Sequence, residues 1–189
     1  MGLSPAQVKR AADVRERLLA AAAGLLVSVG VHGVTLDAVA RSAGVSKGGL
    51  LHHFSNKQKL IEAVLADLLN KLGKDIDDHM TRDPEPYGRF TRAYVATTFV
   101  DFDGERGNLW AALSVALLSD PSLRRIWGEW LTVQLEKHRE TDTAPSLATV
   151  RLAADGVWLA HLLKHASVPM PDFAEVRRDL MALSRRREI

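Results

Sequence analysis

The chain of 189 residues contains no cysteine, so the sequence predicts neither a disulfide framework nor a thiolate metal site. It has no apolar run of about 18 residues, as a membrane span requires, and its N-terminus lacks the pattern of a signal peptide. It also lacks a glycine-rich phosphate loop, a Ser/His/Asp signature and an evident pair of catalytic carboxylates. We therefore expect a cytoplasmic, non-enzymatic protein with no cofactor, no bound metal and no membrane partner.

Net charge is small, at +2, but it is unevenly distributed along the chain. Residues 1–60 carry eight Lys or Arg and three Asp or Glu, a local charge of +5, and the remaining residues carry −3. A basic N-terminal third on a mildly acidic body predicts contact with an anionic surface. Charge alone leaves the alternative open that a few exposed basic residues lie there by chance.

Helical spacing of apolar residues runs through the chain, and no stretch has the alternation of a strand. The sequence therefore predicts an all-α protein. A first helix is expected over 13–29, a second from Thr35 and a third from Ser46, each of these two residues being a good N-cap. A fourth helix follows, capped by Ser55 or Asn56, and weakens at Gly73.

The segment TRDPEPYG, residues 81–88, is rich in proline and is the best candidate for a linker. Beyond it the spacing predicts helices at about 85–102, 106–118, 121–140, 145–167 and 172–186. We expect an N-terminal domain over residues 1–58, a connecting helix that reaches about residue 73, and a larger C-terminal helical domain over 74–189.

Two short helices joined by SAGVS, residues 42–46, and stacked on a longer helix match a helix-turn-helix. In that geometry the second short helix enters the DNA major groove. Gly48 and Gly49 would let its backbone approach the DNA closely, and Lys47 can reach O6 and N7 of guanine. The candidate DNA contacts on these elements are Ser46, Lys47, Gly48, Gly49, His52, His53 and Lys57.

The stretch TLDAVARSAGVSKGGLLHHFSNKQKLIEAV, residues 35–64, resembles the DNA-binding signature of the TetR family of bacterial transcriptional regulators. The matching positions are Thr35, Val39, Ala40, Ala43, Gly44, Val45, Ser46, Gly48, Leu50, His53, Phe54, Lys57 and Leu60. The resemblance implies a phosphate contact for Thr35 in addition to its cap. Leu51 stands where the family usually has tyrosine and can instead touch a thymine methyl. Asp37, an acid close to the expected DNA face, is interpreted as serving the helix dipole.

The resemblance also implies a homodimer, formed by the last two long helices of each chain, which would read a two-fold symmetric operator. Small residues on the apolar face of these helices permit close approach. The residues predicted at this interface are Val150, Ala154, Val157, Trp158, His161, His165, Phe173, Val176 and Leu180. The alternative that they form the core of one chain stays open. His161 and His165 have the spacing of a metal pair, but we interpret them as interface or core histidines.

A ligand cavity among the middle helices is a further implication of the resemblance, and aromatic residues gather there. The candidate ligand-binding residues are Phe99, Phe102, Trp110, Leu113, Leu117, Trp127 and Trp130. Ordinary core packing is the alternative for each of them. The resemblance thus implies a repressor that binds a palindromic operator as a homodimer and is released by a small molecule. A DNA-binding regulator without an effector, whose C-terminal domain serves only dimerisation or a protein partner, is the alternative.

Overall fold

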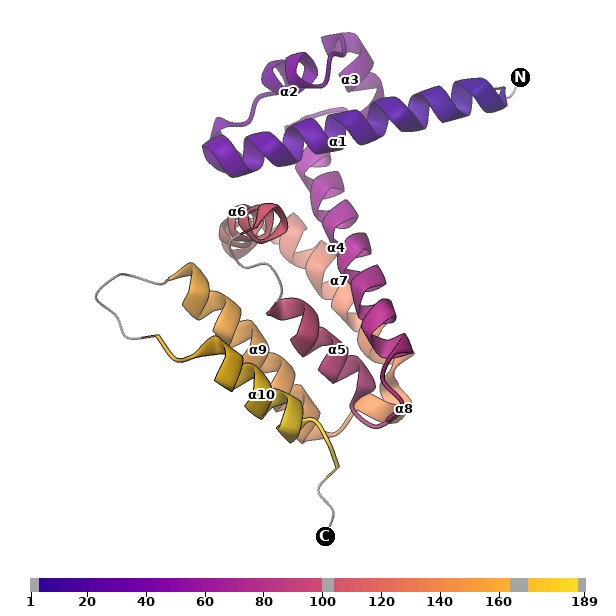
Figure 1. Cartoon of the computed structure of the whole chain (residues 1–189). Helices are drawn as coiled ribbons and strands as arrows, with labels where there is room; N and C mark the ends of the chain where they lie inside the picture. Colours follow the sequence, from indigo (N-terminus) through magenta and orange to yellow (C-terminus); the bar gives the residue numbers. More distant parts are fainter. Residues whose placement is uncertain (1–3, 100–103, 164–169, 187–189) are drawn as a thin grey trace. The chain divides into compact units, whose positions relative to one another are not determined.

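The computed structural model describes residues 4–99, 104–163 and 170–186, and within these ranges all regular secondary structure is helical (Figure 1). The helices are α1 (Pro5–Gly33), α2 (Leu36–Ser42), α3 (Lys47–His53), α4 (Lys57–Thr81), α5 (Arg89–Thr98), α6 (Glu105–Ser119), α7 (Pro121–Lys137), α8 (Arg139–Asp142), α9 (Pro145–Leu162) and α10 (Phe173–Leu183). The predicted all-α class is confirmed. Among these residues no helix is both long enough and apolar enough to cross a bilayer.

The chain divides into two compact units, each assembled from two separate segments. Unit 1 comprises Met1–Leu68 and Asn108–Ile126, and unit 2 comprises Leu69–Gly107 and Trp127–Ile189. Helices α4, α6 and α7 therefore contribute residues to both units. The sequence predicted two domains that are each one continuous segment, with limits at residues 58 and 74. Those limits stay a prediction.

In unit 1, α2 packs against α1, and α3 packs against α2 (Figure 1). Helix α1 begins at Pro5 rather than at Asp13, because Ser4 and Gln7 form a capping box ahead of the predicted start. It is interrupted at Gly30, the position where the sequence predicted its end. The buried residues that hold these helices together include Leu18, Ala22, Leu26, Val39, Ala40, Leu50, Phe54 and Leu60.

Helix α4 is capped by Asn56, whose Oδ1 accepts a hydrogen bond from the Lys59 backbone N–H at 2.9 Å. The helix does not weaken at Gly73 as the sequence predicted, but continues to Thr81. Buried Ile76 holds the stretch beyond the glycine on the core of unit 2. A Cβ at Gly73 would lie 3.9 Å from Nε1 of Trp130, an ordinary contact distance, so the indole ring leaves room for a side chain at this position.

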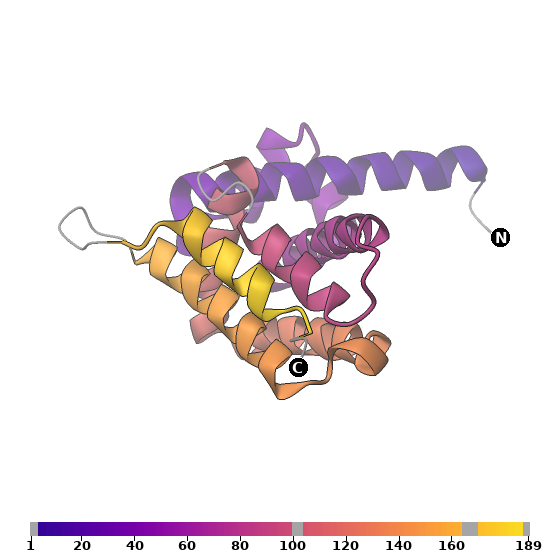
Figure 2. The same cartoon turned by 60° about the horizontal axis from the view of Figure 1, so that its bottom comes forward.

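Unit 2 is centred on α5, α9 and α10, which lie side by side (Figures 1 and 2). Helix α5 begins at Arg89 rather than near residue 85, because Gly88 has a positive φ of 70°, which ends the preceding turn. A Cβ at Gly88 would lie 2.3 Å from the carbonyl oxygen of Ser184. The core includes Ile76, Phe90, Tyr94, Val95, Val150, Ala154 and Leu180.

The single helix predicted over 121–140 is divided at His138 into α7 and α8. Because the chain changes direction there, Asp142, at the end of α8, lies beside the start of α5. There the buried Asp142 carboxylate accepts hydrogen bonds from the Thr91 backbone N–H at 2.8 Å and from the Thr91 hydroxyl at 2.6 Å. Helix α5 therefore receives its N-terminal cap from a residue of a different helix.

Candidate nucleic-acid interface

The turn between α2 and α3 is fixed by backbone hydrogen bonds and by α1. Gly44 has a φ of +63°, which favours glycine, and the Val45 N–H donates to the Ala40 carbonyl at 2.9 Å. The Arg17 guanidinium, on α1, donates to the carbonyl of Ala43 at 3.2 Å. These contacts hold α3 at a defined angle to α1, as a helix-turn-helix requires.

Both short helices begin at the predicted caps. The Thr35 hydroxyl accepts from the Ala38 N–H at 3.2 Å, and the Ser46 hydroxyl accepts from the Gly49 N–H at 3.1 Å. Both cap residues are exposed. Their hydroxyl groups serve the helix starts in this structure while remaining accessible from outside.

Helix α3 is oriented by Leu50, whose side chain is completely buried. Residues on the opposite side of the helix consequently face outward. The exposed residues of α3 are Lys47, Gly48, Leu51 and His52. Leu51 keeps 42% of its surface exposed, an unusual position for a large apolar side chain in a helix of seven residues. The outward face of α3 thus combines a cation, a bare backbone position and an apolar side chain.

The two adjacent glycines of α3 occupy different surroundings. A Cβ built at Gly48 has no described atom within 4 Å, so the space outside this position is open. A Cβ at Gly49 would lie 2.8 Å from Cγ1 of Val45 and 3.3 Å from the Ser46 hydroxyl. Packing within the chain therefore accounts for Gly49, whereas nothing inside the described part of the chain requires a glycine at position 48.

Lys47 pairs with Asp37 across the two short helices. The ammonium nitrogen lies 3.1 Å from the Asp37 carboxylate, and the two side chains are 59% and 62% exposed. The sequence interpretation assigned Asp37 to the dipole of α2, which it also suits as the acid in the first helical turn. Its pairing with Lys47 was missed, because residues ten positions apart on separate helices share no periodic signal.

His53 and Lys57 lie in partly covered positions. Burial, together with the charges of His52 and Arg15, lowers the pKa of His53 and so favours the neutral form of its imidazole. The Lys57 ammonium donates to the carbonyl of His32, near the end of α1, at 3.2 Å. Lys57 therefore has a structural partner in the protein alone, in addition to the phosphate contact expected from the sequence.

The predicted DNA contacts thus fall into two groups. Thr35, Ser46, Lys47, Gly48, Leu51 and His52 are exposed on or beside α3, whereas Gly49, His53 and Lys57 are partly covered.

The residues predicted to bind a ligand are divided between the units. Trp110, Leu113 and Leu117 belong to unit 1, where Leu113 is fully buried. Phe99, Trp127 and Trp130 belong to unit 2, and all three are half-buried. The rings of Trp127 and Trp130 are 5.5 Å apart and tilted. Phe102 lies outside the described residues.

Unit 2 also contains a partly buried polar pair between α5 and α9. The Tyr94 hydroxyl donates to the Asp155 carboxylate at 2.5 Å. Burial raises the pKa of Tyr94 well above its ordinary value, and the Asp155 charge raises it further. Burial also raises the pKa of Asp155, although the Tyr94 hydrogen bond and the Arg151 charge oppose the change. The pair is a polar feature that apolar periodicity does not reveal.

Residues predicted at the dimer interface are mostly covered within one chain. Val150, Ala154, His161 and Leu180 are buried, and Val157, Trp158, Phe173 and Val176 are half-buried. The rings of Trp158 and His161 stack at 5.7 Å. His165 lies outside the described residues, among which no group of three or more His, Cys, Asp and Glu is arranged to hold a metal ion.

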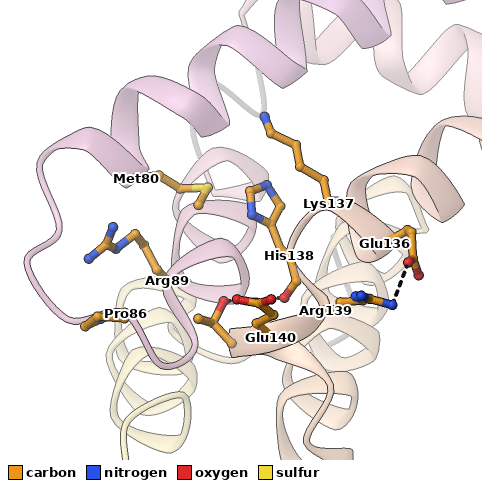
Figure 3. Close-up of a pocket in the computed structure, with 9 residues that line it drawn as sticks. Met80, Pro86, Arg89, Glu136, Lys137, His138, Arg139 and Glu140 are labelled. Carbon is orange, nitrogen blue, oxygen red and sulfur yellow. Dashed lines mark hydrogen bonds and ion pairs between the residues drawn. The ribbon is translucent and has the colours of Figure 1, made fainter.

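A pocket of about 270 Å³ lies in unit 2, around the junction of α7 and α8 (Figure 3). Its lining combines Arg89, Lys137 and Arg139 with two acids, Glu136 and Glu140, and includes none of the predicted ligand-binding residues. Arg139 and Glu136 are paired at 3.3 Å. Lys137 is likewise paired with Asp77 at 3.0 Å, so two of the three cations are engaged by acids in the protein alone.

Comparison with known proteins agrees with the helix-turn-helix geometry. The family model described as "Bacterial regulatory proteins, tetR family" matches residues 18–64, and the model "Tetracyclin repressor-like, C-terminal domain" matches residues 88–185. The chain is 33% identical to the "HTH-type transcriptional regulator BetI" of Serratia proteamaculans, over 81% of this chain and 83% of that protein. The corresponding regulator of Pectobacterium atrosepticum is 30% identical, over 80% and 83%.

Solved structures share the fold. A putative transcriptional regulator from Streptomyces coelicolor A3(2) superposes with a TM-score of 0.70 at 21% identity, over 90% of this chain and 98% of that chain. The multidrug binding protein EbrR, in complex with ethidium, gives a TM-score of 0.68 at 25% identity, over 90% and 97%.

Proposed function

The chain belongs to the TetR family of bacterial regulatory proteins and is a DNA-binding transcriptional regulator, and from this premise we propose that it is a homodimeric repressor. It binds a palindromic operator and leaves it when a small molecule occupies the C-terminal region. Because a transcriptional regulator acts where the DNA lies, we infer that it acts in the cytoplasm.

The exposed face of α3 is the observation that carries the proposal. Lys47 supplies a donor for guanine, and Leu51 supplies an apolar contact for a thymine methyl. The open space outside Gly48 lets the helix backbone approach the bases. Each of these features matches the requirements of a helix in the major groove.

An exposed apolar stripe on α9 supports the homodimer. Leu152, Leu159 and Leu163 are 70%, 47% and 71% exposed, and they share one side of the helix with Gly156. A Cβ at Gly156 would meet no described atom within 4 Å, so a second helix can approach closely there. We assign the contact to this stripe rather than to the buried positions of the same helix. Two chains then present two α3 helices to half-sites roughly 34–36 Å apart.

The half-buried Trp127 and Trp130 support an aromatic or apolar effector. Solved structures of EbrR hold ethidium and malachite green, both aromatic cations. Aromatic faces attract such ligands by stacking and by cation–π contact. An effector works as a switch only by binding the DNA-competent and DNA-incompetent conformations with different affinities.

Selection from a randomised duplex pool at two salt concentrations tests DNA reading. A palindromic consensus whose affinity falls steeply with salt is the expected result, because several phosphate contacts release counterions. If no sequence is enriched and binding at low salt matches that of unrelated DNA, the proposed operator reading is wrong.

Sedimentation of two matched variants tests the dimer. Leu152→Asp is expected to convert the wild-type dimer to monomers, because it buries a charge in the contact. Val115→Asp, on α6, changes a side chain of similar exposure, 68% against 70%, and is expected to remain dimeric. A dimer that survives the Leu152 substitution would contradict the assigned interface.

Tryptophan fluorescence, with malachite green and a metabolite panel as probes, tests the effector. A ligand that quenches the emission and also releases the selected duplex is expected, and Trp130→Phe should reduce the quenching. If no compound that binds releases the duplex, the alternative of a regulator without an effector is favoured.

A further inference from the structure

The ion pair between Asp37 and Lys47 is placed on the outer surface of the helix-turn-helix. The Lys47 ammonium lies 3.1 Å from both carboxylate oxygens of Asp37, so the two charges are held together in the protein alone. Lys47 begins α3, and Asp37 belongs to the first turn of α2. A donor and an acceptor are therefore presented side by side, next to the open backbone at Gly48.

Stability does not explain this pair. Both side chains are more than half exposed, and exposed pairs of this kind contribute little to folding. The start of α2 is already capped by the Thr35 hydroxyl, and the Asp37 side chain is exposed. An acid at this position also repels DNA phosphates, so it opposes binding unless the carboxylate meets a donor on the DNA.

The major-groove edge of a G·C base pair supplies the complementary pattern. Guanine presents two acceptors, N7 and O6, and the paired cytosine presents the N4 amino donor beside them. An A·T pair presents one acceptor, the adenine amino donor, a second acceptor and a methyl group, so its two acceptors are separated. A lysine fixed beside a carboxylate therefore matches G·C better than A·T.

We propose that the Asp37–Lys47 pair reads one G·C base pair in each half-site. Lys47 donates to O6 and N7 of guanine, and Asp37 accepts from N4 of the paired cytosine. The proposal rests on the proposed operator binding and adds the identity of one base pair. Asp37 also weakens binding to unrelated sequences, in which its carboxylate has no partner and faces the phosphates.

Modified bases in the selected operator test each contact separately. In wild-type protein, replacing the G·C pair by A·T is expected to weaken binding by about fivefold or more. N4-methylcytosine at that position blocks the Asp37 contact, and 7-deazaguanine removes the N7 acceptor for Lys47. We expect N4-methylcytosine to weaken binding of wild type but not of Asp37→Ala, and 7-deazaguanine to weaken binding of wild type but not of Lys47→Ala.

A matched substitution controls for net charge. Asp37→Ala and Asp13→Ala both remove one exposed acid from unit 1, but Asp13 lies on α1. Only Asp37→Ala is expected to show a weaker G·C preference at one position and to bind unrelated DNA more tightly. Equal penalties for N4-methylcytosine in wild type and Asp37→Ala, or a consensus without G·C, would overturn the proposal. If the pool yields no consensus at all, the proposed function fails instead.

Discussion

Alanine substitutions at Gly48 and Gly49 test whether each glycine is needed for DNA binding or for packing within the fold. Both positions lie in the first turn of α3, so the gain in helix propensity, up to about 1 kcal/mol, is similar for the two variants. At Gly48 the new methyl group meets no described atom within 4 Å, whereas at Gly49 it meets Val45 Cγ1 at 2.8 Å. Because the propensity terms cancel, the difference in unfolding free energy reports the overpacking at Gly49.

Overpacking of this kind costs about 1–3 kcal/mol. We therefore expect Gly49→Ala to be less stable than Gly48→Ala by that amount in urea unfolding. In a chain of this size each 1 kcal/mol changes the melting temperature by about 2–4 °C. Gly48→Ala itself should equal or slightly exceed the wild type in stability.

DNA binding should respond in the opposite order for a folded protein. If the α3 backbone contacts the bases at Gly48, an added methyl group costs a similar 1–3 kcal/mol at the interface, or about 5- to 150-fold in dissociation constant. Fluorescence anisotropy with the selected duplex measures this loss. A Gly48→Ala variant that is fully folded and binds within twofold of wild type would refute the close approach. Destabilisation of Gly48→Ala would refute the description of open space.

Three further substitutions test individual contacts. Lys57→Ala should weaken binding to all sequences alike and reduce the salt slope by about 1 for each chain, and an unchanged slope would restrict Lys57 to its contact with His32. Asp142→Ala should cost about 3 kcal/mol or more in urea unfolding, because it leaves the buried Thr91 donors unpaired, and a loss below 1 kcal/mol would contradict the cap. Burial, with the charge of Lys137, lowers the pKa of His138 in the folded protein. As the pH falls below about 6.5, His138 therefore takes up a proton more readily in the unfolded chain than in the folded one, and the free energy of unfolding should decrease. His138→Phe, compared with wild type at pH 7.5 and 5.5, should show a smaller fall.

The unit that carries α3 was largely predictable because its signals are local. Thr35 and Ser46 are short-range caps, and the predicted capping by these residues is confirmed by hydrogen bonds to N–H groups three residues ahead. Apolar spacing similarly predicted helices in the regions of α1 and α4. These features depend on residues within one or two helical turns of each other.

Features that depend on distant residues were not predictable. No proline or glycine marks the division between α7 and α8 at His138. Asp142, at the end of α8, caps a helix that begins about 50 positions earlier in the chain. The difference between Gly48 and Gly49 requires knowledge of where the side chain of Val45 lies. For the same reason, sequence periodicity could not indicate that Lys47 meets Asp37.

The division of unit 1 into two segments has a consequence for the order in which the chain acquires its structure. Asp120, from the second segment, accepts a hydrogen bond from Gln58 at 2.8 Å, immediately beside Lys57 at the start of α4. Since domains generally fold as units during synthesis, this unit remains incomplete on the ribosome until residue 126 has emerged from the exit tunnel. The nascent protein therefore has its DNA-reading helices early but completes the unit that supports them only after more than two thirds of translation.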